Sequence, residues 1–568
     1  MRKRTLIWCV AALGLSIWAR PAIASDRAPT PDVIHQIEAA AARGTLDFES
    51  ALLYKVRAIS NPAALPEPYR AQATATPIRC GTPVVAEAYS SLNRLSVSAQ
   101  NEITSSFSRR PTDSTYVSPG GYFVLHYDLD SVNAVPSADD DSSGFPDFIE
   151  RLALYLDSAW NVEVETLGWR RPPSDGTAGG DSLYDVYPTS IGFTYGVTVQ
   201  DSPGPEEWND YSSYILLNKS FLGFPPNDDP EGDQIGSMKV TCAHEFNHAC
   251  QFATSPLHTL VADSWWQEIS ATWMEDIVYD MVNDNYNYLE DYFVDPTISL
   301  FDGGLRKYGA FGFAKVMEEA YDTAVVRDAW ELMRWLQAKQ AIDSAMSFYG
   351  SGLSGLFARF ADWNYFTNSR DDGLHFSEGA EYPLMPIYAT HLLYPILNRP
   401  GPDLQTMASS YIHFEPDPSG RDMVEFTFNG ANGIDWAPTL IQFDSSGSRQ
   451  TFEFDLDPVT SDGKLYLSSF DDMARAVLIG NNVHWSGGAD HYTYSVRFLT
   501  RADCDDDADA DIFDMLYLIE SIFSGGPLPV PVWQMGDLNC SGGLDILDVS
   551  ISIDYILKDG AAPCAPFE

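Results

Sequence analysis

The sequence predicts a multidomain chain in which an α+β domain is followed by an all-β sandwich and then by a small α-helical module. The 568 residues exceed the size of one ordinary domain. Residues 116–404 mix strand-like runs with helical periodicity, and residues 405–500 alternate apolar and polar positions between turns. Residues 501–568 contain two similar acidic segments, each followed by a helical pattern.

Residues 1–24 have the pattern of a secretory signal peptide. A basic start precedes an apolar run and a small-residue cleavage site that ends at Ala24. Cleavage there removes Arg2, Lys3, Arg4 and Arg20 and changes the formal net charge from −46 to −50. This charge disfavours binding to nucleic acid and to anionic lipid. Because no later apolar run is long enough for a membrane span, we expect a secreted bacterial protein.

Residues 25–115 begin with helical patterns and then become rich in proline and alanine. Two interpretations remain open for this region: a pro-segment that is removed, or an N-terminal subdomain. Six cysteines remain after cleavage of the signal, and an even number in an exported protein indicates disulfide bonds. Cys242 and Cys250 lie on one predicted helix, about 12 Å apart along its axis, which is too far for a bond between them.

The domain over residues 116–404 contains the sequence His-Glu-Phe-Asn-His in an apolar helical pattern. Residues four apart share one helix face, so His244 and His248 can bind one metal ion. Glu245 lies beside them, where it can take a proton from water. A catalytic zinc site needs a third ligand, and Glu268 on the next helical pattern is a better candidate than His258, which no glycine turn precedes.

The HEFNH motif followed by WWQEISATWMED resembles the gluzincins, the thermolysin-like clan of zinc peptidases. More widely, residues 80–500 are similar to a group of secreted bacterial proteins classed as metalloproteases. The resemblance implies a zincin-like catalytic domain and Zn²⁺ as a cofactor. It also implies that the metal is bound by His244, His248 and Glu268 and that Glu245 is the general base.

The resemblance leaves two supporting roles to assign. Thr272 stands where thermolysin has an aspartate, so we expect Glu275 or Asp276 to orient a zinc-binding histidine. Gluzincins often place a tyrosine or histidine on a later helix to stabilise the oxyanion, which makes Tyr308 the candidate here. The alternative for Tyr308 is a packed core position. The weaker rivals for this role are His258, His375 and His391.

A strand-like run, YSSYILLN, lies just before the predicted zinc helix. Zincin edge strands pair with extended peptides, so we expect this run to bind a protein or peptide substrate by backbone pairing.

Three acidic segments have oxygen ligands at the spacing of a calcium loop. The first comprises Asp139, Asp141, Ser143, Asp147 and Glu150. Its alternative is a solvated acidic turn. The second comprises Asp503, Asp505, Asp507, Asp511 and Asp514, with Ala508 in place of the turn glycine. The third comprises Asp537, Asn539, Ser541, Asp545 and Asp548, with Gly542 at the turn.

The last two loops begin 34 residues apart, and their arrangement resembles dockerin type I modules. The resemblance implies bound Ca²⁺ and a cohesin-type partner. We expect a disulfide between Cys504 and Cys564 to join the two ends of this module.

Residues 79–83 read Arg-Cys-Gly-Thr-Pro and resemble the cysteine switch of matrix metalloprotease pro-segments. In such a switch a thiolate occupies the open coordination position of zinc. The alternative, which cysteine pairing favours, is a disulfide between Cys80 and Cys242 or Cys250.

Together these motifs predict a secreted zinc metalloendopeptidase that hydrolyses peptide bonds. One alternative is a non-catalytic extracellular assembly protein that acts through its dockerin-like module. Another is a zinc hydrolase of non-peptide bonds, or an aminopeptidase, although no diagnostic motif for binding a substrate amine is present. The intact HExxH motif together with Glu268 argues against the non-catalytic alternative.

Overall fold

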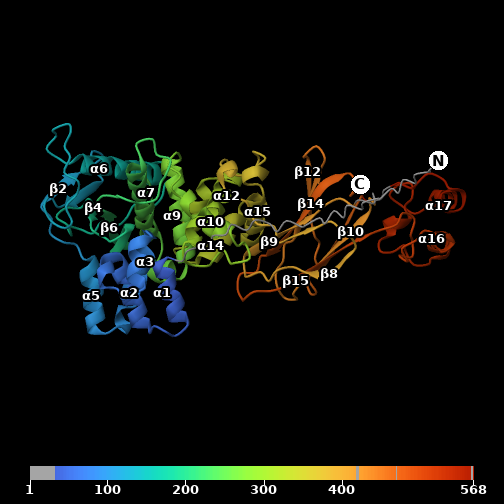
Figure 1. Ribbon diagram of the computed structural model, residues 1–568, viewed down its shortest axis with the longest axis horizontal. Coiled ribbons are helices and arrows are strands. Elements are labelled where there is room, and N and C mark those ends of the chain that lie inside the picture. Colours follow the sequence, from blue (N-terminus) through green and yellow to red (C-terminus); the bar gives the residue numbers. More distant parts are fainter. Residues whose placement is uncertain (1–31, 418–420, 469, 565–566, 568) are drawn as a thin grey trace, which may run out of the picture.

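The chain is a multidomain protein of mixed α and β structure with several sheets. The computed structural model describes residues 32–417, 421–468, 470–564 and 567, so the predicted signal peptide lies outside the described residues. Along the long axis, N-terminal helices and a first sheet lie at one end and two short helices at the other, with helices and two further sheets between them (Figure 1). Among the described helices, none is both long and apolar enough to cross a membrane.

The N-terminal helices pack on one face of the first sheet. These helices are α1 (Val33–Ala42), α2 (Phe48–Ser60), α3 (Tyr69–Ala75), α4 (Thr82–Ser90) and α5 (Val97–Phe107). Aspartate or serine side chains cap the first turns of α1, α2 and α5, as expected for helix starts. Val56 and Ile103 share a buried core with Val197, Val199 and Leu216 of the sheet.

The first sheet has the strand order β1-β5-β6-β4-β3-β2. Its strands are β1 (Ile78–Cys80), β2 (Ser114–Val117), β3 (Phe123–Tyr127), β4 (Tyr184–Thr189), β5 (Thr194–Pro203) and β6 (Tyr211–Asn218). The expectation that YSSYILLN is an edge strand is wrong, because this run is β6 and pairs with β4 and β5. Strand β5 pairs antiparallel with β6, on the side away from β4. Strand β1 pairs in parallel with β5 and forms the edge of the sheet.

A helical layer covers the other face of this sheet. It includes α6 (Asp147–Trp160), which continues as the π-helix η3 (Asn161–Thr166), and α7 (Asp233–Thr254), α8 (Leu257–Ala262) and α9 (Ser264–Tyr279). Helix α7 is buried along most of its length between the sheet and α9, and its polar residues in this stretch are buried with the apolar ones. Phe246 of α7 packs against Phe123, Trp160 and Tyr184.

Further helices extend this layer towards the middle of the molecule (Figure 1). They are α10 (Tyr286–Phe293), α11 (Arg306–Gly309), α12 (Gly312–Ala320), α13 (Ala324–Leu332), α14 (Ala338–Ser347) and α15 (Leu353–Tyr365). Most of their apolar residues belong to the same core as α7 and α9.

Two more sheets follow, with strand orders β13-β10-β15-β8 and β12-β11-β14-β9-β7. Their strands are β7 (Ala389–His391), β8 (Ile396–Pro400), β9 (Ala408–Phe414), β10 (Val424–Gly430), β11 (Thr439–Asp444), β12 (Arg449–Glu453), β13 (Asp462–Leu467), β14 (Met473–Asn482) and β15 (Tyr492–Phe498). Apolar side chains from both sheets form one core, in which Phe414 of β9 contacts Phe426 of β10. Strands β7 and β8 belong to these sheets although they precede residue 405.

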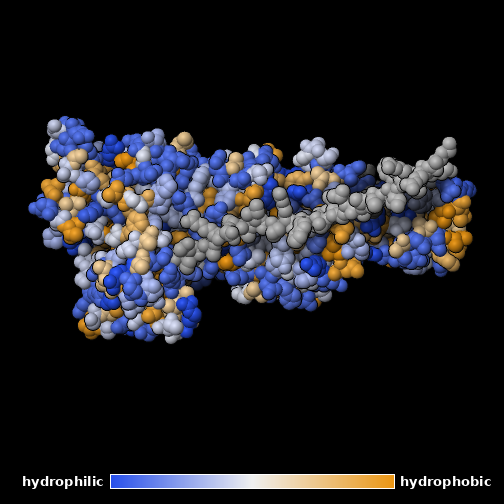
Figure 2. Space-filling view, viewed as in Figure 1, coloured by the Kyte–Doolittle hydropathy of each residue, from blue (hydrophilic) through white to orange (hydrophobic). Residues whose placement is uncertain are grey.

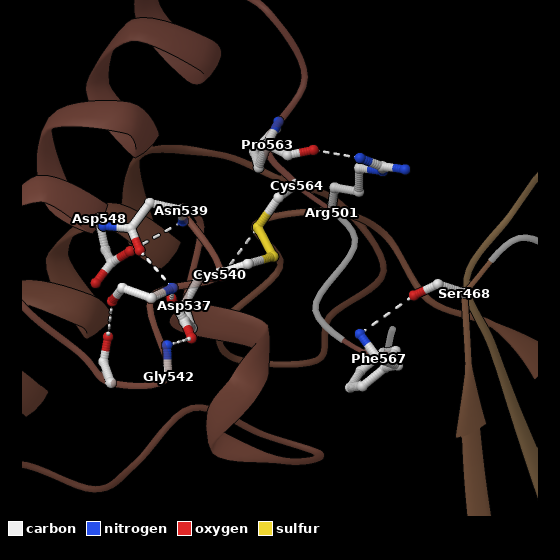
Figure 3. Close-up of a disulfide and its surroundings, with 12 residues drawn as sticks. Ser468, Arg501, Asp537, Asn539, Cys540, Gly542, Asp548, Pro563, Cys564 and Phe567 are labelled. Atoms are coloured by element: carbon white, nitrogen blue, oxygen red, sulfur yellow. Dashed lines mark hydrogen bonds between the residues drawn. A yellow bond between two sulfur atoms is a disulfide. The ribbon is translucent and has the colours of Figure 1, made fainter.

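The C-terminal module contains α16 (Ile512–Ser524) and α17 (Ile546–Lys558), each of which begins with an aspartate capping box. The predicted Cys504–Cys564 disulfide is wrong. Cys564 bonds to Cys540 (Figure 3). Cys504 is a buried free thiol. Both copies of the acidic segment place a cysteine near the loop, so spacing alone did not distinguish the two partners.

This pairing can be checked by peptide mapping under non-reducing conditions. We expect a linked peptide that contains Cys540 and Cys564, and alkylation of the denatured protein should label the other thiols: Cys80, Cys242, Cys250 and Cys504. Because the disulfide closes a loop of 24 residues, Cys564→Ser should lower the free energy of unfolding of this module by roughly 3 kcal/mol. A linked peptide that joins Cys504 to Cys564 would contradict the assignment.

Candidate metal centre

Two buried helices bring the predicted ligands together. His244 and His248 lie one turn apart on α7, and Glu268 lies on α9, which packs against α7. Their donor atoms face one another, since Glu268 Oε2 lies 3.4 Å from His244 Nε2 and Glu268 Oε1 lies 3.4 Å from His248 Nε2. The three residues form one compact donor set that is inaccessible to solvent.

A fourth donor comes from the N-terminal part of the chain. The Sγ of Cys80, at the end of β1, lies 3.3 Å from His248 Nε2. The four donor atoms of Cys80, His244, His248 and Glu268 lie within 4.8 Å of one another. The disulfide that we favoured for Cys80 is therefore wrong, because Cys80, Cys242 and Cys250 are all free thiols.

The donor set fits a tetrahedral zinc ion. At bond lengths of about 2.0–2.3 Å, neighbouring ligand atoms are about 3.3–3.7 Å apart, which agrees with the distances above. Two nitrogens, one carboxylate and one sulfur are also the donors that zinc prefers among the common divalent metals. No hard oxygen cage of the kind that Mg²⁺ or Ca²⁺ requires is formed by these four side chains.

The electrostatics of the cluster also favour a cation. His244 Nε2 and both carboxylate oxygens of Glu268 have no hydrogen-bond partner among the described residues. Against the effect of burial, Glu268 and Glu275 raise the pKa of His244 to about 9. Burial, together with Glu245 and Glu268, raises the pKa of the Cys80 thiol well above its usual range. A positive ion would offset this excess of negative potential.

Each histidine is oriented through its other ring nitrogen. His244 Nδ1 lies 2.6 Å from Glu275 Oε1, which assigns Glu275 rather than Asp276 to the role expected from the sequence. Asp276 instead pairs with Lys315 at 2.6 Å. His248 Nδ1 lies 2.8 Å from Gln251 Oε1, a contact that sequence reasoning missed although Gln251 follows one helical turn later.

Glu245 projects from α7 towards β5. Its Oε2 accepts hydrogen bonds from the hydroxyls of Thr198, at 2.7 Å, and Thr82, at 3.0 Å, whereas its buried Oε1 has no partner among the described residues. The approach of β5 depends on Gly196, where an added Cβ would lie 2.5 Å from Glu245 Cγ. The predicted base is thus held against β5, the strand next to the edge strand β1 of the first sheet.

The segment around Cys80 covers the outer side of β5. Strand β1 pairs with β5 so that Ile78 is opposite Thr194 and Cys80 is opposite Gly196. The Thr82 hydroxyl both donates to Glu245 and accepts a hydrogen bond from the Thr198 backbone N–H at 2.7 Å. The backbone groups of β5 that a peptide could contact here are therefore occupied by the chain itself.

Tyr308 is buried beside the cluster, in a small apolar contact with Cys80 and Tyr288. Burial and the nearby Glu268 and Cys80 raise the pKa of Tyr308 well above its usual range. A cavity of about 440 Å³ between the N-terminal helices and the loop before α11 is lined by both Cys80 and Tyr308. The rival histidines lie elsewhere: His258 is exposed, His375 stacks on Phe366 and His391 bonds to Tyr494.

In the first predicted calcium loop, the carboxylates of Asp139, Asp141 and Asp147 lie close enough to hold one ion. The Ser143 N–H donates to Asp139 and Asp141, at 2.9 and 3.0 Å, and Gly144 has φ +89°. Among the described residues, Glu150 is not part of this group. The loop has the turn of a cation-binding segment without its expected last ligand.

The two C-terminal loops have matching backbone conformations. In one, the N–H groups of Asp507 and Ala508 donate to Asp503. In the other, the N–H group of Ser541 donates to Asp537, and so does that of Gly542 (Figure 3).

Several of the predicted ligands in the first of these loops also meet. Carboxylates form two overlapping groups, Asp503 with Asp505 and Asp514, and Asp509 with Asp511 and Asp514. Position 508 has φ +79° and position 542 has φ +86°, so the first loop places an alanine in a conformation that favours glycine.

No protein-family model matches the chain, and no curated protein matches it.

The alanine at position 508 gives a direct stability test. Ala508→Gly should stabilise the first loop by about 1 kcal/mol because it removes the steric cost of φ > 0. Gly542→Ala should destabilise the second loop by a similar amount. Hydrogen exchange of α16 and α17 in the full chain, with and without calcium, measures the two loops separately. Equal protection of α16 before and after Ala508→Gly would contradict the strain assigned to this position.

Proposed function

We propose that the chain is a secreted zinc-dependent endopeptidase of the gluzincin type, with its metal centre covered by its own N-terminal segment. The observation that carries this proposal is the convergence of His244, His248 and Glu268, with Glu245 beside them. The Cys540–Cys564 disulfide supports an exported protein, since such bonds persist in oxidising compartments. On this proposal the sheet with α6 to α15 is a zincin-like domain and the paired sheets are an accessory β-sandwich.

The roles of the side chains follow from their positions. Bound zinc would supply Lewis acidity towards a peptide carbonyl and would lower the pKa of water. Glu245 holds the acceptor oxygens for the water proton and delivers that proton to the leaving amine. The Tyr308 hydroxyl stabilises the carbonyl oxygen as negative charge develops there. Glu275 and Gln251 keep the two imidazoles in the tautomer and orientation that metal binding needs.

The N-terminal segment would keep this centre inactive. With zinc bound, the Cys80 thiolate would be its fourth ligand in place of water, and the Thr82 hydroxyl engages the general base. Strand β1 occupies the β5 edge, along which an extended substrate would pair. Activation therefore requires Cys80 to move away from the metal centre and β1 to move away from β5. This arrangement is similar to a cysteine switch.

The C-terminal module supports a second, compatible function in assembly. Its helices expose large apolar side chains to solvent, and Figure 2 shows apolar residues gathered at this end. They include Ile512, Phe513 and Leu516 of α16 and Ile546, Leu547 and Leu557 of α17. We propose that this dockerin-like module binds Ca²⁺ and docks onto a cohesin-type protein, so that the enzyme acts within an assembly.

The general base can be tested in the calcium-loaded protein after limited proteolysis. Glu245→Gln should retain bound zinc, because Glu245 is not a ligand, and should hydrolyse casein roughly 10²–10⁴-fold more slowly. Zinc content and casein hydrolysis are measured on the same preparations, with the exposed Glu207→Gln as a matched control. A wild-type protein that holds no zinc, or that holds zinc and never cleaves a peptide, would refute the proposed function.

The covering role of Cys80 can be tested before any proteolysis. Cys80→Ser in the unprocessed chain should raise hydrolysis of a short peptide at least tenfold relative to wild type, because loss of the thiolate–metal contact frees a coordination position and also weakens the docking of β1 on β5. The cobalt-substituted wild type should show thiolate-to-cobalt charge-transfer absorption that Cys80→Ser lacks. Cys250→Ser changes a buried thiol outside the donor set and serves as the control. The proposal fails if the unprocessed Cys80→Ser protein gains no activity and keeps the absorption band.

A further inference from the structure

Arg79, the residue before Cys80, has a positive charge that is buried against later parts of the chain. The Arg79 side chain is 1% exposed, although it belongs to β1 at the edge of the sheet. An arginine is seldom buried without compensating partners. The groups that compensate Arg79 all come from residues beyond position 190, outside the N-terminal helices.

Two carboxylates and two aromatic rings form the walls around Arg79. Its guanidinium pairs with Glu275 and, at 3.0 Å, with Asp284. The guanidinium carbon lies 4.3 Å from the ring centre of Tyr195 and 5.7 Å from that of Tyr288. A flat cation between carboxylates and aromatic faces is the arrangement that arginine satisfies better than lysine.

The negative charge of this pocket comes from Glu275 and Asp284, which lie outside the N-terminal segment. Glu275 has a second partner in His244, but among the described residues Asp284 has no ion-pair partner other than Arg79. The neutral Tyr195 hydroxyl donates to Asp284 at 3.2 Å. If β1 leaves, the pocket keeps buried acidic groups and aromatic walls and loses its cation.

The pocket also lies where a substrate side chain would point. Cys80 is in the donor set of the metal centre, and Arg79 is its neighbour on the strand paired with β5. A peptide that replaces β1 along β5 would place a side chain at the Arg79 position, one residue from the reacting centre. The same carboxylates that hold Arg79 would then face that side chain.

We propose that this pocket is a specificity subsite for a basic side chain, above all arginine, of the protein substrate. The inference rests on the proposed peptidase function and adds the substrate class to it. In the covered form Arg79 occupies the subsite in place of the substrate side chain. The two-carboxylate, two-tyrosine pocket of Glu275, Asp284, Tyr195 and Tyr288 is called the arginine pocket below.

A binding experiment tests the arginine pocket without reference to activity. Arg79→Ala in the full chain vacates the pocket, and isothermal calorimetry then measures binding of ethylguanidinium, with neutral ethylurea as the matched probe. We expect saturable binding of ethylguanidinium alone, no binding to wild type, and at least tenfold weaker binding when Asp284→Asn is added. Absence of ethylguanidinium binding to folded Arg79→Ala would overturn the proposal. If Arg79→Ala does not fold, Arg79→Gln is used in the same way.

Peptide cleavage tests the subsite in the processed protein. A fluorogenic library carries arginine or the uncharged isostere citrulline at each position in turn. We expect one position at which arginine raises kcat/KM at least tenfold over citrulline, and Asp284→Asn should reduce that ratio towards one. The control is Asp280→Asn, which changes an exposed carboxylate just after the end of α9 and should leave the ratio unchanged.

The outcomes separate the two proposals. Cleavage without preference for arginine at any position overturns the arginine pocket and leaves the peptidase function standing. Failure to cleave any peptide, with or without bound zinc, overturns the proposed function and with it the substrate subsite. Preference for arginine that Asp284→Asn leaves unchanged also overturns the pocket, because the preference then arises elsewhere.

Discussion

The Glu275 carboxylate connects three segments that are far apart in the sequence. It accepts the hydrogen bond of His244 on α7, it belongs to α9, and it pairs with Arg79 of β1. A buried carboxylate is tolerated only when cations or donors surround it. The orientation of one candidate metal ligand and the docking of the N-terminal segment therefore depend on the same group. The burial of α7 and α9 in one core keeps that group fixed.

The parts of the site that follow from local sequence pattern were predictable. His244 and His248 are four residues apart, and a helix places such residues on one face whatever the rest of the fold does. Glu268 was assigned from a second helical pattern, and the two helices pack as that assignment requires. The choice between Glu275 and Asp276 was not decided by the sequence, because both lie on the same helix and only packing shows which one faces His244.

The remaining features arise from contacts between residues distant in sequence. Strand β1 has three residues, too few for a pattern, and it pairs with β5 more than one hundred residues later. YSSYILLN lies inside the sheet because β5 pairs along its other side. The periodicity of a strand does not predict which strands become its neighbours. The same limit explains the disulfides: the even number of cysteines was informative, but it did not distinguish Cys504 from Cys540 as the partner of Cys564.

The core shared by the N-terminal helices and the first sheet limits how the covered form can mature. Loss of α1 to α5 would expose Val197, Val199 and Leu216 to water, so on the proposed function we expect these helices to stay on the sheet. The short stretch that carries Arg79 and Cys80 would then move, together with release of Glu245 by the Thr82 hydroxyl at the start of α4. Residues 74–75, which are exposed, end α3 and are separated from β1 by two residues. A single nick there, at the end of α3, would free the N-terminal end of the strand while the other N-terminal helices stay in place, so maturation would not need to shorten the folded protein.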